Sequence, residues 1–469
     1  MTDRPNILFI MTDDHTVREM TCYGGNQLPP TPNLDRIASD GTRFTNAFCT
    51  NALCAPSRAT VLTGALSHVH GIRGNSESAD DIEVLDPTVP TFPELLQAAG
   101  YRTGLVGKYH IRQAPRGFDT WCIHPGQGVY FDPVYIYNGT EVQKHGYATD
   151  ITTDMAIDFL QQSRSQPFCL VHQFKAPHRP FTPAPRHAGL FADVEPPLPP
   201  AFDDDYTTRR IADLSEDMRF DVSLAPDYDD LPPNLDAPER KRWIYRRFIR
   251  DRWRTIVGVD ENVGRVLDHL DETGRADDTL VIYTSDHGYF LGEHGWYDKR
   301  FMYDPAERIP FVARFPGATP SGVVSNDLAM NVDVAPTILD FAGVEIPATV
   351  QGCSLRPLMQ GTPPEDWRQS VYYAYYEDSW RLRDTGPEQM SEPGFRYFTS
   401  HRIGPHRGIR THHDKLIEYH SEGDYWEYFD LNSDPHELVN RYDDPACAKR
   451  VAELARELST LRLQYGDLD

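Results

Sequence analysis

The stretch Ile7-Leu8-Phe9-Ile10-Met11-Thr12-Asp13-Asp14 joins a short apolar run directly to a pair of acids. Its apolar residues do not alternate with polar ones, and this pattern indicates a strand buried on both faces, as in a parallel sheet. Similar apolar runs recur at residues 103–106, 168–174, 280–284 and 311–315. We therefore expect five buried parallel strands.

Helical patterns separate these runs. Residues 92–99 form one, and residues 245–270 form a longer one whose apolar side chains fall along a single stripe. Gly274 follows it as a plausible stop signal. Alternation of strands and helices predicts a doubly wound α/β domain.

Two changes in composition suggest further organisation. Residues 192–238 are rich in Pro and Asp and poor in periodic apolar residues, which is typical of a long insertion or lid with some short helix. After residue 347 we expect short antiparallel strands and then a closing helix at residues 447–463. Those strands are residues 371–376, 408–410, 415–419 and 425–430. The predicted domains are residues 1–364, which include the insertion, and a smaller C-terminal α+β domain at residues 365–469.

Charge and cysteine content narrow the classes of function. The 469 residues carry 46 basic and 70 acidic side chains, a formal net charge of −24, which repels nucleic acid and anionic membranes. A site for a small anion therefore needs a local concentration of Lys, Arg, His or metal. The N-terminal residues lack the pattern of a secretory signal, and the seven cysteines form no CxxC pair, so we expect a cytoplasmic protein without a disulfide framework.

Acids and bases gather behind the predicted strands, where ligands bind in open α/β sheets. These residues are Asp13, Asp14, Lys108, His110, Lys175, His178, Asp286 and His287. Each has an ordinary explanation: an Asp pair caps helices or forms turns, and alternating polar residues can form a solvated face. Those explanations do not predict acids and bases at the ends of successive strands, so we expect a functional site at this edge.

The acids suggest a metal ion. Carboxylate oxygens suit hard cations such as Ca²⁺ or Mg²⁺, and His287 could supply one nitrogen or an outer contact. The spacing of Cys and His does not fit structural zinc. Several carboxylates with loose geometry favour Ca²⁺, with Mg²⁺ or Mn²⁺ as the alternatives.

A cysteine motif lies between the first two of these strand ends. Residues 52–64 read Ala-Leu-Cys-Ala-Pro-Ser-Arg-Ala-Thr-Val-Leu-Thr-Gly. A lone cysteine is usually a small buried hydrophobe, and Arg58 could be a cation on a helix surface. However, the segment from Cys54 to Arg58 resembles the signature of the type I sulfatases of the alkaline phosphatase superfamily. A maturation enzyme oxidises the cysteine of that signature to formylglycine, also called 3-oxoalanine.

Other landmarks of the family follow in its order. Residues 100–110, Gly-Tyr-Arg-Thr-Gly-Leu-Val-Gly-Lys-Tyr-His, resemble its second signature, and residues 352–358 and 428–437 look like its late landmarks. Between them lie Ala176-Pro177-His178, Asp286-His287 and Lys299. The resemblance runs from about residue 6 to residue 434. It implies an alkaline-phosphatase-like fold with a large mixed, mostly parallel sheet flanked by helices.

The resemblance also implies roles for single residues. A divalent cation would bind Asp13, Asp14, the hydrated formylglycine at Cys54, Asp286 and His287. Arg58 and Lys108 would stabilise the alkoxide and the sulfate oxygens. Lys299 and His178 would bind sulfate, and one of them would protonate the leaving alcohol. His110 would deprotonate the second hydroxyl and so expel sulfate.

We predict a hydrolase of sulfate monoesters that acts on a small sulfated saccharide. Residues 292–303 look closest to carbohydrate sulfatases, and Trp296 or Tyr303 could either stack on a sugar or pack in the core. The family often has Asn where this chain has His287. Some sulfatases carry His there, and so do phosphonate monoester and phosphodiester hydrolases of the superfamily. Such a hydrolase, with the same nucleophile and metal, is the alternative, and a non-catalytic anion- or glycan-binding relative is a third interpretation. A formylglycine-generating enzyme is the expected maturation partner, and the oligomeric state stays open.

Overall fold

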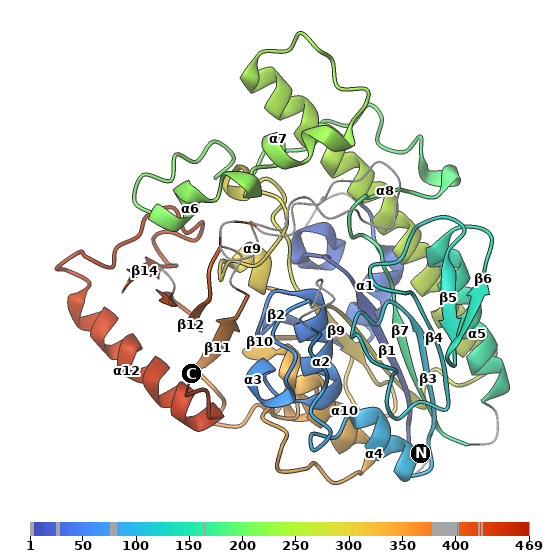
Figure 1. Cartoon of the computed structure of the whole chain (residues 1–469). Helices are drawn as coiled ribbons and strands as arrows, with labels where there is room; N and C mark the ends of the chain where they lie inside the picture. The colour runs from blue at the N-terminus through green and yellow to red at the C-terminus, as the bar shows by residue number, and fades with distance from the viewer. Residues whose placement is uncertain are drawn as a thin grey trace. The chain divides into compact units, whose positions relative to one another are not determined.

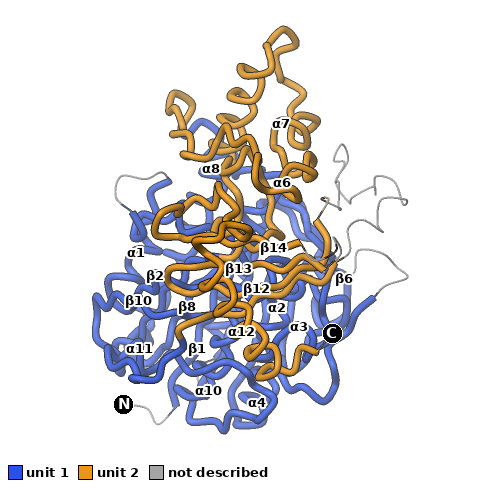
Figure 2. Tube along the Cα trace, turned by 90° about the vertical axis from the view of Figure 1, so that its left-hand side faces the viewer, with its two compact units in different colours: residues 1–190, 252–288, 308–368 blue, residues 191–251, 289–307, 369–469 orange. Residues whose placement is uncertain are grey.

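The computed structural model of the chain describes residues 4–24, 29–75, 82–163, 166–377, 401, 403–420, 423 and 425–468. It divides into two compact units, each built from three separate stretches of chain (Figure 2). Unit 1 comprises residues 1–190, 252–288 and 308–368, and unit 2 comprises residues 191–251, 289–307 and 369–469. Among the described residues no helix is long and apolar enough to cross a membrane.

Unit 1 is built on a ten-stranded sheet with the order β10-β2-β9-β8-β1-β7-β3-β4-β5-β6 (Figure 1). Its strands are β1 (Asn6–Thr12), β2 (Thr42–Phe48), β3 (Arg102–Gly107), β4 (Thr120–Ile123), β5 (Val134–Tyr137), β6 (Thr140–Gln143), β7 (Phe168–Gln173), β8 (Thr279–Ser285), β9 (Phe311–Arg314) and β10 (Val323–Met330). The central pairs β8-β1, β1-β7 and β7-β3 are parallel, which confirms the predicted mixed, mostly parallel sheet.

One strand differs from the expectation. The apolar run at residues 311–315 forms β9, which pairs antiparallel with both β8 and β2. The prediction of a parallel strand was wrong here, because a continuous apolar run reports burial on both faces and carries no information about strand direction. Its four residues are all buried, so the burial part of the prediction holds.

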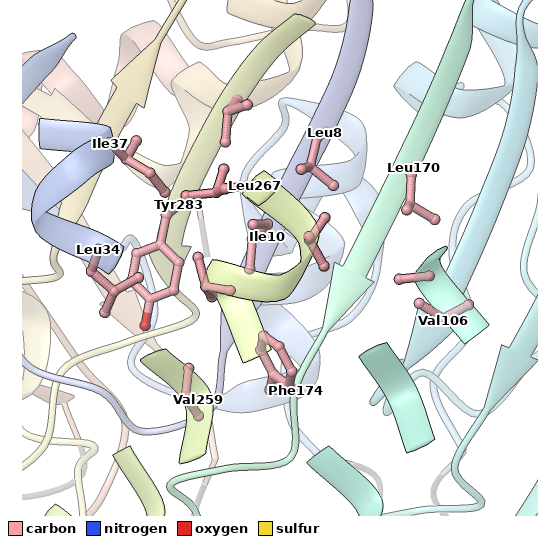
Figure 3. Packing of buried hydrophobic residues seen from close by; sticks show 14 of the residues in the cluster. Leu8, Ile10, Leu34, Ile37, Val106, Leu170, Phe174, Val259, Leu267 and Tyr283 are labelled. Carbon is pink, nitrogen blue, oxygen red and sulfur yellow. The ribbon is translucent and has the colours of Figure 1, made fainter. Parts of the chain in front are cut away.

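Helices of unit 1 flank this sheet (Figure 1). They are α1 (Pro32–Ser39), α2 (Cys54–Thr63), α3 (Ser67–His70), α4 (Phe92–Ala98), α5 (Ala148–Gln162), α10 (Val334–Ala342), α11 (Arg356–Met359) and the later part of α8 (Ala237–Glu272). Figure 3 shows the core, in which Leu8 and Ile10 of β1 pack in one buried cluster with Val259 and Leu267 of α8. Strands buried on both faces are thereby fixed in place, and their ends form a rigid edge.

Unit 2 contains a four-stranded antiparallel sheet in the order β11-β12-β13-β14. Its elements are β11 (Ser370–Tyr375), β12 (His406–Thr411), β13 (Asp414–Tyr419), β14 (Tyr425–Asp430), α6 (Arg210–Leu214), α7 (Phe220–Ser223), α9 (Asp304–Glu307), α12 (Ala448–Tyr465) and the first part of α8. The four predicted C-terminal strands and the closing helix are therefore confirmed. Trp296 and Tyr303 are fully buried, and the Trp296 ring stacks on Phe301 with centroids 4.7 Å apart, so core packing is the observed role of both.

The insertion at residues 192–238 is irregular apart from short helices, and ion pairs tie it to α8. Lys241 Nζ lies 2.9 Å from Asp203, and Arg246 Nε lies 2.6 Å from Glu195. Buried aromatic residues hold the segment as well, because the rings of Phe202 and Phe220 lie 5.1 and 5.8 Å from the ring of Tyr245 in α8.

Candidate active site

The ends of β1 and β8 bring the predicted acids together. Thr12 and Ser285 are register partners in the parallel pair, so the residues behind them leave the sheet side by side. The Asp286 amide donates to the Thr12 carbonyl at 3.2 Å, and the Asp14 amide donates to Asp286 Oδ1 at 3.2 Å. Asp13, Asp14 and Asp286 are at most 1% exposed. Three carboxylates are thus buried at one strand edge.

Lys108 reaches the same place from β3. Gly107, the last residue of β3, has φ = 103°, and a Cβ there would lie 1.7 Å from the Gln173 carbonyl oxygen, so only glycine fits. The Lys108 amide donates to that carbonyl at 2.9 Å. The Lys108 ammonium group forms an ion pair with Asp13, and both side chains are fully buried. The strand end therefore delivers a cation directly to one of the acids.

Cys54 is the first residue of α2 and is fully buried. Its Sγ lies 3.3 Å from Asp13 Oδ1, 3.5 Å from His287 Nε2 and 3.9 Å from Lys108 Nζ. The first turn of a helix presents unpaired amide groups and the positive end of the helix dipole, which favour negative charge at this position. The structure places Cys54 among the predicted metal ligands, where a nucleophile is expected.

Arg58 follows one helical turn later on α2. Its Nε and Nη2 donate to Asp286 Oδ2 at 3.1 and 3.0 Å, and its Nη1 donates to the Lys108 carbonyl at 2.5 Å. Burial opposes the charge of the guanidinium, but Asp286 and Asp13 outweigh it and raise the pKa of Arg58 above its ordinary value. The residue therefore stays cationic in a fully buried position.

His287 has an orientation that suits metal ligation. Its Nδ1 lies 2.8 Å from the Gly288 carbonyl oxygen, and a carbonyl only accepts, so Nδ1 carries the proton in the neutral ring. Its Nε2 then presents a lone pair 3.4 Å from Asp14 Oδ1 and 3.5 Å from Asp286 Oδ1. Three acceptor atoms thus converge, an arrangement that a cation stabilises.

His178 extends the cluster on the side of Asp14. Its Nδ1 lies 2.7 Å from the Arg179 carbonyl oxygen, and its Nε2 lies 3.8 Å from Asp14 Oδ2. His178 is 3% exposed. The contact between Nδ1 and a backbone carbonyl oxygen fixes the orientation of the His178 ring, as it does for His287.

The residues fit a divalent cation. Donor atoms of Asp13, Cys54, Asp286 and His287 lie within 4.8 Å of one another, and so do those of Asp13, Asp14, Cys54 and His178. Three buried carboxylates face two buried cations, Arg58 and Lys108, which leaves an excess of negative charge. Oxygen-rich sites with carboxylates are typical of Ca²⁺ and Mg²⁺.

His110 and Lys299 are the remaining two predicted site residues. His110 lies two residues beyond Lys108, is 6% exposed and has a left-handed backbone with φ = 62°. Lys299 belongs to unit 2, where its Nζ lies 3.3 Å from Asp298 Oδ1 and 5.8 Å from the centroid of the Tyr289 ring. The roles assigned to both stay predictions.

Two glutamines contact the site and were missed by sequence reasoning. Gln127 Oε1 accepts from Lys108 Nζ at 2.6 Å, and Gln173 Oε1 accepts from Arg58 Nη1 at 3.1 Å. Gln173 is the last residue of β7, so its place at a strand end was a usable signal. Gln127 lies between Gly126 and Gly128, and only the folded loop shows that it reaches Lys108.

The chain matches known families over most of its length. Residues 5–344 match the sequence profile of the family described as Sulfatase. Residues 389–464 match the profile described as N-sulphoglucosamine sulphohydrolase, C-terminal.

Similar proteins of known name and structure agree with this match. An N-acetylglucosamine-6-O-sulfatase of Bacteroides thetaiotaomicron is 40% identical, with 100% of this chain and 88% of that protein covered. The N-acetylglucosamine-6-sulfatase of Homo sapiens is 30% identical, with 84% and 71% covered. A solved structure of a protein in complex with its substrate D-glucosamine-2-N,6-O-disulfate gives a TM-score of 0.89 at 40% identity, with 99% of both chains covered. A phosphonate monoester hydrolase from Silicibacter pomeroyi, with a TM-score of 0.76 at 24% identity, shares the fold.

Proposed function

Because the chain belongs to the sulfatase family and is a hydrolase of sulfate esters, we propose that it removes the 6-O-sulfate group of glucosamine in a small sulfated saccharide. The relative that is 40% identical over the whole chain is named for this activity, and the similar solved structure holds a 6-O-sulfated glucosamine. The observation that carries the proposal is the buried cluster around Cys54, which supplies a nucleophile position, acids and cations in one place.

We propose that a formylglycine-generating enzyme converts Cys54 to formylglycine, whose hydrate carries two hydroxyl groups on one carbon. Asp13, Asp14, Asp286 and His287 would hold Ca²⁺, with Mg²⁺ or Mn²⁺ as alternatives. When bound, the cation favours the ionised form of one of these hydroxyls. This explains why the acids and the residue at position 54 are buried together.

Residues of this chain would then carry out the transfer. The oxygen at position 54 attacks sulfur, and the bond from sulfur to the sugar oxygen breaks. Arg58 and Lys108 offset the charge on the attacking oxygen and the sulfate oxygens. His178 or Lys299 donates a proton to the departing sugar oxygen, so that a neutral alcohol leaves.

Release of sulfate requires the second hydroxyl. His110 takes its proton, the electrons form the carbonyl of the aldehyde, and the bond from that carbon to the sulfate oxygen breaks. Water then adds to the aldehyde and restores the hydrate. A serine or cysteine nucleophile has no second hydroxyl for this step, which is why a formylglycine is proposed.

The charge of the chain limits its other partners. A formal net charge of −24 opposes binding to nucleic acid or anionic membranes, so we propose neither as a partner. Together with a bound divalent cation, the buried Arg58 and Lys108 would outweigh the three site carboxylates and give the local positive charge that an anionic substrate needs.

Sulfate release from a panel of defined saccharides tests the proposal. N-acetylglucosamine 6-sulfate and glucosamine 2-N,6-O-disulfate should be hydrolysed at the 6-position with a higher kcat/KM than the 3-O- and 4-O-sulfated isomers. Preference for another position would contradict the proposed substrate. The comparisons favour sulfate over phosphonate esters, and a higher kcat/KM for an aryl phosphonate than for the matched aryl sulfate would contradict that preference.

A further inference from the structure

Asp14 has an unusual backbone conformation. Its φ of 70° is in the left-handed region, which costs free energy in residues other than glycine and persists only where neighbouring contacts hold it. The backbone amide of Asp14 donates to Asp286 Oδ1 at 3.2 Å, and the backbone amide of His15 donates to Ser285 Oγ at 2.9 Å. These two bonds fix the turn against the end of β8.

The carbonyl side of Asp14 is held by a different element. Arg252 of α8 donates from Nη2 to the Asp14 carbonyl oxygen at 2.7 Å. The same guanidinium donates from Nε and Nη2 to the two carboxylate oxygens of Glu19, at 3.0 and 2.6 Å. Arg252 and Glu19 are 0% and 1% exposed. One planar group thus clamps both ends of the segment that follows β1.

The charges of this pair cancel. Arg252 carries one positive charge and Glu19 one negative charge, so the pair leaves the charge excess of the three site carboxylates unchanged. The pair would therefore affect cation binding by fixing the conformation of Asp14 and not by adding net negative charge near the cation. A lysine cannot reproduce the contacts, because only the guanidinium fork bonds both carboxylate oxygens and a carbonyl at once.

We infer that Arg252, paired with Glu19, is a positioning residue that sets the backbone of Asp14 and so presents its carboxylate to the bound cation. The inference rests on the cation site of the proposed function. Groups that orient a metal ligand typically change metal affinity about 10- to 100-fold when they are removed.

Calorimetric titration of Ca²⁺ into metal-free protein tests this inference without an activity assay. Arg252→Met should raise the Kd for Ca²⁺ about 10- to 100-fold, because Asp14 loses the contact that holds its carbonyl. Arg252→Lys, which keeps the charge but loses the fork, should give a smaller increase. Thermal unfolding without Ca²⁺ shows whether each variant is folded, and all proteins should come from one host so that Cys54 is in the same state.

Arg314→Met is the matched control. Arg314 is 4% exposed and pairs with Asp40 at 3.1 Å, so it too is a buried arginine of unit 1. Its register partner on β8 is Val281, whereas Asp286 follows the opposite end of β8. Arg314→Met should lower stability without changing the Kd for Ca²⁺. If Arg252→Met does not fold, Glu19→Gln provides the test, with an increase in Kd expected.

The outcomes separate this inference from the proposed function. If the unaltered protein binds none of Ca²⁺, Mg²⁺ and Mn²⁺ in such titrations, the cation site itself is overturned, and the positioning role with it. If the unaltered protein binds Ca²⁺ and the folded Arg252 and Glu19 variants bind it with the same Kd, only the positioning role is overturned. An equal loss of affinity in Arg314→Met would also overturn it, because the effect would then be one of general stability.

Discussion

Two buried clusters in this molecule contain the same charged groups, three carboxylates with one arginine and one lysine. The first, in unit 1, is the candidate active site, with Asp13, Asp14, Asp286, Arg58 and Lys108. The second, in unit 2, contains the buried residues Glu307, Glu437, Arg410 and Lys415 and the half-buried Asp304. Both have an excess of one negative charge when every group is ionised.

The two clusters balance this excess in different ways. In unit 2, Lys415 Nζ lies 2.8 Å from Asp304, 2.6 Å from Glu307 and 2.5 Å from Glu437, so a covalently attached cation occupies the centre. Burial raises the pKa of Glu437 to about 8, an effect that Lys415 opposes and Asp304 reinforces, so that a proton can remove the remaining charge.

The cluster in unit 1 has a different centre. Its lysine pairs with Asp13, and the oxygens of Asp14 and Asp286 face the lone pair of His287 Nε2 at 3.4 and 3.5 Å. Buried acids alone therefore do not identify a metal site. The distinguishing feature is the convergence of two carboxylate oxygens on the ring nitrogen His287 Nε2, a set of atoms that suits a metal ion.

Loss of the nucleophile should have the largest effect. Cys54→Ala is expected to lower kcat for sulfate release by more than about 10³-fold, because no other group can form the covalent intermediate. The unit 2 cluster and the stability of the protein should be unaffected. Cys49→Ala, which removes another buried cysteine, should retain activity. Comparable loss in both variants would argue against a special role for position 54.

Removal of the central cation of unit 2 should be the next largest effect. Lys415→Met leaves Glu307 and Glu437, both buried, and the half-buried Asp304 without their central partner, and breaking a buried ion pair costs about 3–5 kcal/mol of unfolding free energy. Denaturant titration measures this change. A variant as stable as the unaltered protein would show that Lys415 is not the stabilising centre of its cluster.

Removal of metal should affect only the unit 1 cluster. Ca²⁺ at about 100 times its Kd should stabilise the protein by about 2.7 kcal/mol, and a chelator should reverse this. Asp14→Asn should weaken the response, whereas Asp304→Asn should leave it intact. If Ca²⁺ still stabilises Asp14→Asn but no longer stabilises Asp304→Asn, the Ca²⁺ site would belong to the unit 2 cluster and not to the unit 1 cluster.

Unit 2 should also show a dependence of stability on pH. The pKa of Glu437 is raised from its ordinary value of 4.5 to about 8, so between these values the folded state binds a proton that the unfolded state has lost. Stability should therefore fall as pH rises through this range and level off above it. Glu437→Gln should flatten this slope in thermal unfolding curves. An unchanged slope would show that Glu437 ionises normally in the folded protein.

Local patterns predicted much of the fold. The apolar runs that form β1, β3, β7 and β8 gave the parallel centre of the sheet, because burial on both faces is visible in the sequence. The direction of β9 was not visible, since it depends on the connections to β8 and β2. The short strands β5 and β6, at one end of the sheet, were missed because most of their residues are exposed or half-buried and form no continuous apolar run.

The site was predictable to the extent that its residues belong to motifs. Asp13, Cys54, Lys108 and His287 were found because strand ends and the cysteine signature mark them. Gln127 and Arg252 were not, because each reaches the site from a loop or helix whose path depends on the folded chain. Trp296 shows another limit: the sequence left sugar stacking and core packing open, and the structure shows that its side chain is buried in unit 2.

The state of residue 54 tests the central claim most directly. Trypsin should cleave after Arg43 and Arg58 and release residues 44–58, which contain both Cys49 and Cys54. In protein from its native host, mass spectrometry of this peptide should show an aldehyde in place of the thiol at position 54 and an intact thiol at Cys49. An unmodified thiol at position 54 in catalytically active protein would contradict the proposed mechanism.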